Sequence, residues 1–231
     1  LETLGAISAR RSGGRGARDV RASRVLQIAQ PVSTATLGNL HALILAAGAA
    51  RRYGAPKALA KLGDRRLLDL AIARAQALVD GRYTVILGAH ASTIIAAIDL
   101  APRHVVTHES WTLGLAESLK HGLRLLPADA DAALVMLVDQ PAITDDDLHN
   151  LAVAWLVDPT KPAAAEYAGD IGAPCILPRH LFGAAMQLTG DRGAKALLRA
   201  VDGLTRVPMD SAAYDVDTPD DLARLARTLT S

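Results

Sequence analysis

Basic side chains and glycines meet in one short segment, LILAAGAARRYGAPKAL at residues 43–59, which begins with an apolar run. Gly48 and Gly54 permit backbone conformations and close approaches that other residues do not allow. Arg52 and Lys57 could neutralise phosphate oxygens, the arginine through two parallel hydrogen bonds and the lysine as a point charge. Together with free backbone N–H groups, such side chains can form a triphosphate-binding loop.

The same segment fits neither of the two common phosphate-binding motifs. It lacks the Gly-Lys-Ser/Thr ending of a Walker loop, and it lacks the third glycine of the dinucleotide-binding fingerprint. On its residues alone, the segment is therefore as compatible with a solvated basic turn as with a phosphate loop.

Acidic residues lie at the ends of expected strands and helices elsewhere in the chain. Asp139 comes directly after the apolar run AALVMLV and is placed to hold Mg²⁺, which is often bound by one or two carboxylates plus substrate phosphates. Its alternative role is to cap the following segment. Asp217 and Thr218 would similarly cap the last expected helix. The remaining acids in these regions are expected to be charges at helix N-termini; they are Asp145, Asp146, Asp147, Asp220 and Asp221.

The elements that must position these residues alternate between apolar runs and amphipathic segments. Strands are expected at 41–47, 83–88, 104–108 and 132–138, and more weakly at 161–169, 172–178 and 204–209. Helices are expected at 65–79, 91–99, 114–126, 144–157, 179–188, 193–201 and 218–229. This alternation predicts one domain over residues 41–231, an α/β fold with a mostly parallel sheet covered by helices on both faces, a three-layer Rossmann-like arrangement.

In such a sheet, the ligand lies outside the carboxyl ends of the strands. The loops at 47–57, 139–141 and 215–218 all follow expected strands or precede the last helix, and they carry the basic and acidic residues described above. We therefore expect Asp139 and Asp217, far apart in the sequence, to be brought together only by the fold.

Composition excludes several classes of function. The net charge is +1 and aromatic residues make up 3% of the chain, which argues against nucleic acid as a partner. Cys175 is the single cysteine, so a disulfide framework or a cysteine-based zinc site is excluded. No histidine pair has metal-ligand spacing, and no apolar run of 18 residues is present. We expect a cytoplasmic protein without a membrane partner, preceded by a disordered, Arg-rich tail over residues 1–40.

The basic segment resembles the signature of the MobA-like nucleotidyltransferases, L-A-[AG]-G-x-S-x-R-M-G-x-x-K. Seven positions match: Leu45, Ala46, Ala47, Gly48, Arg52, Gly54 and Lys57. Ala50 replaces the usual Ser, and Tyr53 replaces the usual Met. Arg51 falls on a variable position and is expected to face solvent.

Five further segments resemble family motifs in the same order along the chain. VDQP at 138–141 is similar to G-D-[QM]-P, with Val138 in place of Gly, and YDVDTPDDL at 214–222 is similar to D-[IV]-D-T-P-[ED]-D-L. The tryptophan- and serine-containing segment at 108–123 and the GAPCILPRHLF and LTGDRGAKALL segments also match. The last of these is expected to form a turn near the acceptor, at Asp191, Arg192 and Gly193. The resemblance covers residues 41–228 and implies the nucleotide-diphospho-sugar transferase type of fold.

The resemblance also implies an activity: transfer of a nucleoside monophosphate from an NTP to a phosphorylated acceptor, with Mg²⁺-dependent release of pyrophosphate. Arg52 and Lys57 would be catalytic, and Asp139 and Asp217 would hold the metal. The implied nucleotide-binding residues are Leu45, Ala46, Ala47, Gly48, Arg52, Lys57, Gly88, Ser118 and Asp139. The LAAG start favours the cytidylyltransferase branch, hence CTP, a molybdopterin acceptor, and a molybdoenzyme or its chaperone as a further partner.

Other functions stay open at this point. A guanylyltransferase would use GTP, and Glu117 beside Ser118 could favour a sugar phosphate or another small phosphorylated acceptor. A non-catalytic nucleotide-binding accessory protein could have the same fold. A dinucleotide-binding oxidoreductase is disfavoured, because the third glycine and an acid after the second strand are both absent.

Overall fold

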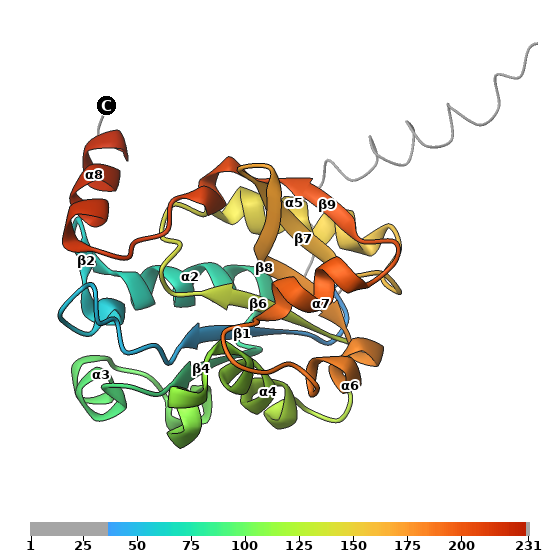
Figure 1. Cartoon of the computed structure of the whole chain (residues 1–231), viewed down its shortest axis with the longest axis horizontal. Helices are drawn as coiled ribbons and strands as arrows, with labels where there is room; N and C mark the ends of the chain where they lie inside the picture. The colour runs from blue at the N-terminus through green and yellow to red at the C-terminus, as the bar shows by residue number, and fades with distance from the viewer. Residues whose placement is uncertain (1–36, 230–231) are drawn as a thin grey trace, which may run out of the picture. The chain divides into compact units, whose positions relative to one another are not determined.

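The computed structural model describes residues 37–229, which form a three-layer α/β/α arrangement (Figure 1). The strands are β1 (Leu40–Ala46), β2 (Lys61–Leu62), β3 (Arg65–Arg66), β4 (Tyr83–Leu87), β5 (Val105–Thr107), β6 (Ala132–Leu137), β7 (Ala163–Tyr167), β8 (Asp170–Pro178) and β9 (Thr205–Pro208). The helices are α2 (Leu67–Val79), α3 (Ala91–Ala97), α4 (Leu115–Leu125), α5 (Asp145–Leu156), α6 (Phe182–Ala185), α7 (Ala194–Ala200) and α8 (Pro219–Leu229).

Seven strands form the central sheet in the order β5-β4-β1-β6-β8-β7-β9, and β2 and β3 form a separate two-stranded ribbon. Within the central sheet, β8 pairs antiparallel with both β6 and β7, whereas the other neighbouring strands are parallel. The predicted Rossmann-like, mostly parallel sheet is thus confirmed, with one strand reversed.

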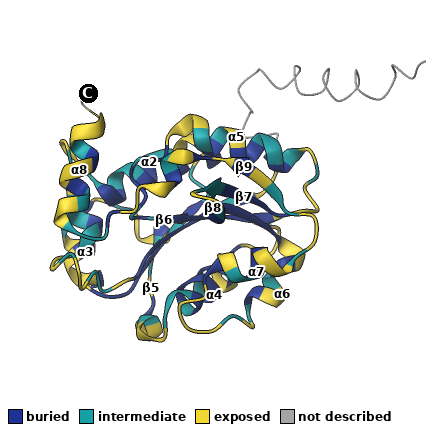
Figure 2. Ribbon diagram, turned by 45° about the horizontal axis from the view of Figure 1, so that its top comes forward, coloured by how far each residue is buried: buried dark blue, intermediate teal, exposed yellow. Residues whose placement is uncertain are grey.

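The central strands are buried on both faces, as their continuous apolar sequences require. Leu43 and Leu45 of β1 pack into a cluster that includes Leu119 of α4, while the alternate residues Ala42 and Ile44 are fully buried toward the other face. Figure 2 shows the two layers: α2 and α5 cover one face of the sheet, and α4, α6 and α7 cover the other.

The position of the candidate site follows from the order of the connections. After β1 the chain builds outward through β4 and β5, and it then returns to place β6 on the opposite side of β1. The carboxyl ends of β1 and β6 are therefore neighbours, with Leu45 paired to Leu137. Such a reversal of strand order opens a crevice at the carboxyl ends of the strands, where ligands bind in this class of sheet.

Two threonine caps begin the helices that follow the acidic loops. Thr144 and Asp147 exchange hydrogen bonds at the start of α5, and Thr218 and Asp221 do the same before Pro219 at the start of α8. The predicted cap at Thr218 is confirmed, and Asp147 and Asp221 serve helix ends. The other three predicted terminal acids, Asp145, Asp146 and Asp220, lie in the first turns of these helices.

Two segments differ from their predicted structure. The helix expected at 179–188 is reduced to a 3₁₀ turn and the four-residue α6, which contains Gly183, a poor helix former. The strand expected at 172–178 begins two residues earlier and forms an antiparallel hairpin with β7. Hydrophobic alternation does not encode strand direction, so the sequence could not predict this reversal.

The fold begins before residue 41. Leu37 is 1% exposed, and the Asn39 N–H donates to Asp131 Oδ2 at 3.2 Å. Residues 37–40, assigned to the tail in the sequence analysis, are therefore part of the folded unit. The expectation of disorder for the preceding residues, 1–36, concerns a segment outside the described range.

Two of the histidines near element ends have packing roles. His104 stacks on Tyr83 with ring centroids 4.3 Å apart, and His108 stacks on His121 at 4.7 Å. Burial and the nearby His121 lower the pKa of His108. Within residues 37–229, no helix is both long and apolar enough to cross a membrane.

Candidate active site

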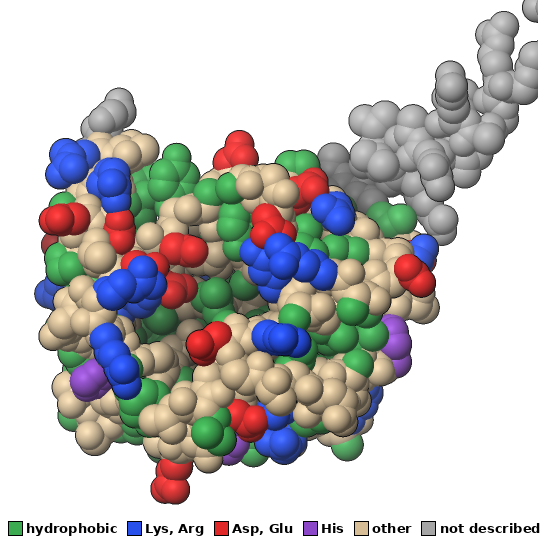
Figure 3. Space-filling model, in the orientation of Figure 1, with side chains coloured by type: hydrophobic (Ala, Val, Ile, Leu, Met, Phe, Trp, Pro, Cys, Tyr) green, Lys and Arg blue, Asp and Glu red, His purple; other side chains and the backbone are tan. Residues whose placement is uncertain are grey.

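A cavity of about 440 Å³ opens at the carboxyl ends of β1 and β6. It is visible as the hollow in the face shown in Figure 3, with acidic and basic side chains on its rim. Its walls include the segment after β1, the start of α4 and the Asp139 loop. Nine of the ten predicted site residues line it: Leu45, Ala46, Ala47, Gly48, Arg52, Lys57, Ser118, Asp139 and Asp217.

Three carbonyl groups of the loop at 47–54 accept hydrogen bonds, those of Ala47, Ala49 and Ala50. The turn after β4 supplies two contacts: the Ala89 N–H donates to Ala47 O at 3.0 Å, and His90 Nε2 lies 3.4 Å from Ala49 O. The carbonyl of Ala50 accepts from the N–H groups of residues 53 and 54, at 2.9 and 3.0 Å.

The N–H groups of the same loop are available. Within the described part of the chain, the backbone N–H groups of residues 48–52 donate to no protein acceptor. Ala50, in the middle of this run, has a φ of 48°, a left-handed conformation that is uncommon for a residue other than glycine. A run of free N–H groups around such a residue forms a concave site suited to an anion.

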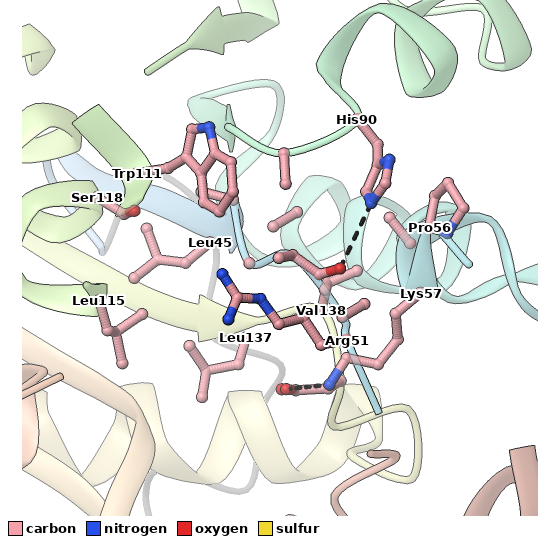
Figure 4. A pocket seen from close by; sticks show the side chains of 18 of the residues that line it. Leu45, Arg51, Pro56, Lys57, His90, Trp111, Leu115, Ser118, Leu137 and Val138 are labelled. Atoms are coloured by element: carbon pink, nitrogen blue, oxygen red, sulfur yellow. Dashed lines mark hydrogen bonds and ion pairs between the residues drawn. The ribbon is translucent and has the colours of Figure 1, made fainter. Parts of the chain in front are cut away.

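Lys57 connects this loop to both predicted acids. Its Nζ lies 2.8 Å from Asp139 Oδ2 and 3.3 Å from Asp217 Oδ1, and its side chain is 13% exposed (Figure 4). Arg52 Nη2 lies 2.9 Å from Asp217 Oδ2. The fold thus brings Asp139 and Asp217 close together, with the Lys57 ammonium between them.

The two acidic segments are also joined through their backbones. The Val216 N–H donates to the carbonyl of Asp139 at 2.8 Å, which sets the position of Asp217 beside the end of β6. Next to Asp139, the buried Gln140 donates to the carbonyl of Ala212 at 2.9 Å. Partial desolvation of the carboxyl group and the nearby charge of Asp139 raise the pKa of Asp215, although the residue as a whole is exposed.

Gly88 lies behind the cavity and does not line it. A Cβ atom at this position would stand 2.5 Å from Trp111 Cβ and 2.7 Å from the carbonyl oxygen of Ala47. The glycine therefore allows Trp111 and the basic loop to approach the end of β4, and its predicted contact with the nucleotide has no counterpart in the shape of the cavity.

Arg51 lines the cavity, contrary to the expectation that it only faces solvent. Figure 4 shows its side chain extending into the cavity. Within residues 37–229, its guanidinium has no hydrogen bond or ion pair, whereas Arg52 and Lys57 are paired with acids. Its position in the family signature is variable, so the motif could not identify it.

Several other lining residues were missed, among them Ala89, His90 and Leu115. His90 belongs to the turn after β4, in a segment where only Gly88 was singled out. A general rule could have found it, because residues that directly follow the parallel strands border the ligand crevice.

The opposite wall contains part of the segment where a turn was predicted at Asp191, Arg192 and Gly193. Asp191 lines the cavity, and the carbonyl of Gly190 accepts a hydrogen bond of 3.0 Å from the N–H of Ala116 in α4. Glu117, considered as a possible specificity residue, instead pairs with Lys120 and does not line the cavity.

The comparisons with known proteins agree with this geometry. The model of the MobA-like NTP transferase domain matches residues 42–206. The chain belongs to this family. It is therefore a member of the nucleotidyltransferases, and the family resemblance in its motifs is confirmed.

Solved structures resemble the transferase domain over most of its length. A mycobacterial homologue of Rv0371c, from Mycobacterium sp. strain JC1, is 32% identical and covers 83% of this chain and 97% of its own, with a TM-score of 0.72. Rv0371c of Mycobacterium tuberculosis H37Rv, in a crystal structure with manganese, is 27% identical and covers 82% of this chain and 99% of its own, with a TM-score of 0.70.

A curated relative matches a shorter part of the domain. The bifunctional protein GlmU of Jannaschia sp. (strain CCS1) is 31% identical over 123 residues, or 52% of this chain. The match spans 27% of the length of GlmU.

Proposed function

We propose that this chain transfers a nucleoside monophosphate from an NTP to a phosphorylated small molecule, with release of pyrophosphate. One observation carries the proposal: the free N–H groups of residues 48–52 lie in a cavity with Lys57, which bridges Asp139 and Asp217. An anion site beside two converging carboxylates is suited to a metal-bound triphosphate.

The chemistry requires positioning and charge neutralisation more than proton transfer. An acceptor phosphate is already ionised at neutral pH, so its attack on the α-phosphorus needs no general base. Arg52 and Lys57 would balance the charge of the triphosphate, which grows on the pyrophosphate as it leaves. Arg51, whose guanidinium is free, would bind a further anionic group of one of the two substrates.

The acidic residues fit a divalent cation. Asp139 Oδ1 is buried and has no hydrogen-bond partner within the described chain, so its lone pairs are available for a metal. Asp139 and Asp217 would hold Mg²⁺, which would neutralise phosphate charge when bound. Within residues 37–229, no group of three or more His, Cys, Asp or Glu residues could hold a metal. The two carboxylates therefore need substrate phosphates or waters to complete the coordination. Manganese in the Rv0371c structure supports a divalent cation in this family.

For the nucleotide and acceptor, we propose CTP and molybdopterin on the basis of the LAAG motif, with GTP as the alternative nucleotide. A sugar phosphate or another small phosphorylated acceptor is an equal alternative. A molybdoenzyme or its chaperone in the cytoplasm would then receive the product. A nucleotide-binding accessory protein would keep the anion site without needing the two carboxylates, whereas both are present here.

Pyrophosphate release tests this proposal. The protein is mixed with each of the four NTPs, Mg²⁺ and either molybdopterin or a panel of sugar 1-phosphates, and pyrophosphate is measured enzymatically. We expect release with one nucleotide and one acceptor class, and none when Mg²⁺ is chelated. Release with a sugar phosphate alone would replace molybdopterin as the acceptor. NTP binding without release under any combination would favour the accessory protein.

A further inference from the structure

Two residues that line the cavity, Ala50 and His90, have left-handed backbone conformations. Ala50 in the basic loop has a φ of 48°, and His90 after β4 has a φ of 61°. Such conformations are unfavourable for residues with a Cβ atom and persist where the surrounding structure holds them. The side chain of His90 reaches back to the loop, where its Nε2 lies 3.4 Å from the carbonyl oxygen of Ala49 (Figure 4).

This contact constrains the peptide between Ala49 and Ala50. A carbonyl oxygen only accepts hydrogen bonds, so Nε2 must carry a proton and donate. Because the peptide group is planar and trans, its N–H points opposite to its C=O. Holding the Ala49 carbonyl toward His90 therefore directs the Ala50 N–H away from His90. That N–H is one of the free donors in the 48–52 run.

The loop has no other side-chain support of this kind. Within residues 37–229, His90 is the only side chain with a hydrogen bond to a backbone carbonyl of residues 47–54. Ala50, which stands where the family signature has Ser, has no hydroxyl that could form a hydrogen bond. A rotation of the Ala49–Ala50 peptide would exchange the N–H donor for a carbonyl oxygen, which repels phosphate.

We infer that His90 is a positioning residue for the triphosphate: its imidazole holds the Ala49–Ala50 peptide so that the Ala50 N–H remains a phosphate donor. The inference rests on the proposed function, since it assumes that the loop binds the phosphates of an NTP. Its action passes through the peptide, so His90 should affect nucleotide affinity more than turnover.

Equilibrium binding to the full chain tests the inference. CTP, the other three NTPs and inorganic triphosphate are titrated into wild type and into His90→Ala, His90→Gln and His90→Phe, by calorimetry. We expect His90→Ala to weaken binding about tenfold, a loss of about 1.4 kcal/mol. Inorganic triphosphate should lose as much as the preferred nucleotide. His90→Gln, whose amide can donate to Ala49 O, should stay within about threefold of wild type, and His90→Phe should resemble His90→Ala.

Controls separate this role from general stability. His180→Ala changes an exposed histidine outside the cavity and should bind like wild type, and thermal melts should show all variants folded. In steady state, His90→Ala should raise the KM for the NTP with little change in kcat, and His90→Gln should restore it.

Several results would overturn the inference. His90→Phe equal to His90→Gln would show a packing role, and unchanged affinity in His90→Ala would show no role. A loss for nucleotides without a loss for inorganic triphosphate would place His90 against the base or ribose. If the wild type bound no NTP at all, the proposed function would fail with it, whereas failure in the variants alone leaves that function standing.

Discussion

The lining of the cavity and the surface of α7 outside it hold their charges in different ways. On the wall formed by the loop after β1, Lys57 is 13% exposed and contacts two carboxylates delivered by distant segments. On α7, which follows the Asp191 turn but does not line the cavity with these side chains, Lys195 and Arg199 share a single carboxylate, that of the partly exposed Asp170. These two hydrogen-bonded partners hold the pKa of Asp170 well below its usual range.

This difference indicates which of the two regions can change. Ion pairs in solvent contribute little to stability, so residues around Asp170 can be exchanged at low cost. Removing one partner of a largely buried pair leaves an uncompensated charge, which is much less favourable. We therefore interpret the Lys57 wall as the fixed side of the proposed nucleotide site and the α7 surface around Asp170 as a region that can vary.

The largest expected effect comes from the fixed wall. Asp139→Asn keeps the shape of the side chain and removes the charge that we assign to the metal, so turnover should fall at least about 100-fold. Pyrophosphate release measures the rate, and circular dichroism should show an intact fold. Asp170→Asn, which removes a carboxylate outside the cavity, is the matched control. A near-normal rate in Asp139→Asn would remove this residue from the metal site.

The packing behind the fixed wall can be disturbed without changing a charge. Gly88→Ala would place a Cβ atom 2.5 Å from Trp111 Cβ. We therefore expect the free energy of unfolding, measured by urea denaturation, to fall by about 1–3 kcal/mol. Gly183→Ala, in α6, has open space around the added atom and serves as the control. Equal stability of Gly88→Ala and the wild type would show that the loop and Trp111 can separate without cost.

Arg51 tests whether an arginine that lines the cavity matters more than an exposed arginine that does not. Arg51→Ala should raise the KM for one substrate about tenfold, because a charged hydrogen bond contributes about 1.5–3 kcal/mol. Arg192→Ala removes an exposed arginine beside Asp191 that does not line the cavity, and it should change KM little. A larger rise in KM for Arg192→Ala than for Arg51→Ala would contradict a substrate-binding role of Arg51.

The smallest expected effect is that of Asp170→Asn. At pH 7, the NTP affinity of this variant should equal that of the wild type, and its stability should be nearly the same. The reason is that the ion pairs of Asp170 with Lys195 and Arg199 are accessible to solvent. The folded-state pKa of Asp170 is lowered from the usual 3.8, so the contribution of its charge is present above that value. It is lost as the pH falls through the lower, folded-state pKa. Thermal melts between pH 7 and pH 2 should therefore show the melting temperatures of the variant and the wild type becoming closer in acid. A difference in melting temperature that grows in acid would contradict this.

The features that could be predicted from the sequence were those that depend on residues close together in the chain. The apolar run of β1, the Thr218 cap and the basic loop were all recognisable, because burial, capping and phosphate binding each require particular residues at short spacing. The direction of β8 depends on pairing with distant strands, and no local pattern records it.

The same limit applies within the site. The convergence of Asp139 and Asp217 could be expected from the position of ligand sites in such sheets, but the bridging role of Lys57 could not. Gly88 was predicted to contact the nucleotide, and its close approach to Trp111 adds a packing role that the sequence could not indicate. Arg51 and His90 depend on which way a side chain turns, which sequence spacing does not determine.

The hydrogen bond from the Val216 N–H to the Asp139 carbonyl makes the end of the folded unit part of the cavity. The central sheet includes no strand after β9, while Asp217 lies beyond the solvent-exposed residues 213–215. A protease that cut this exposed stretch would leave Asp217 attached to the sheet only through non-covalent contacts, among them the Val216–Asp139 hydrogen bond and the ion pairs with Arg52 and Lys57. Every strand of the sheet would stay in place, while the carboxylate and α8 would be held by those contacts alone.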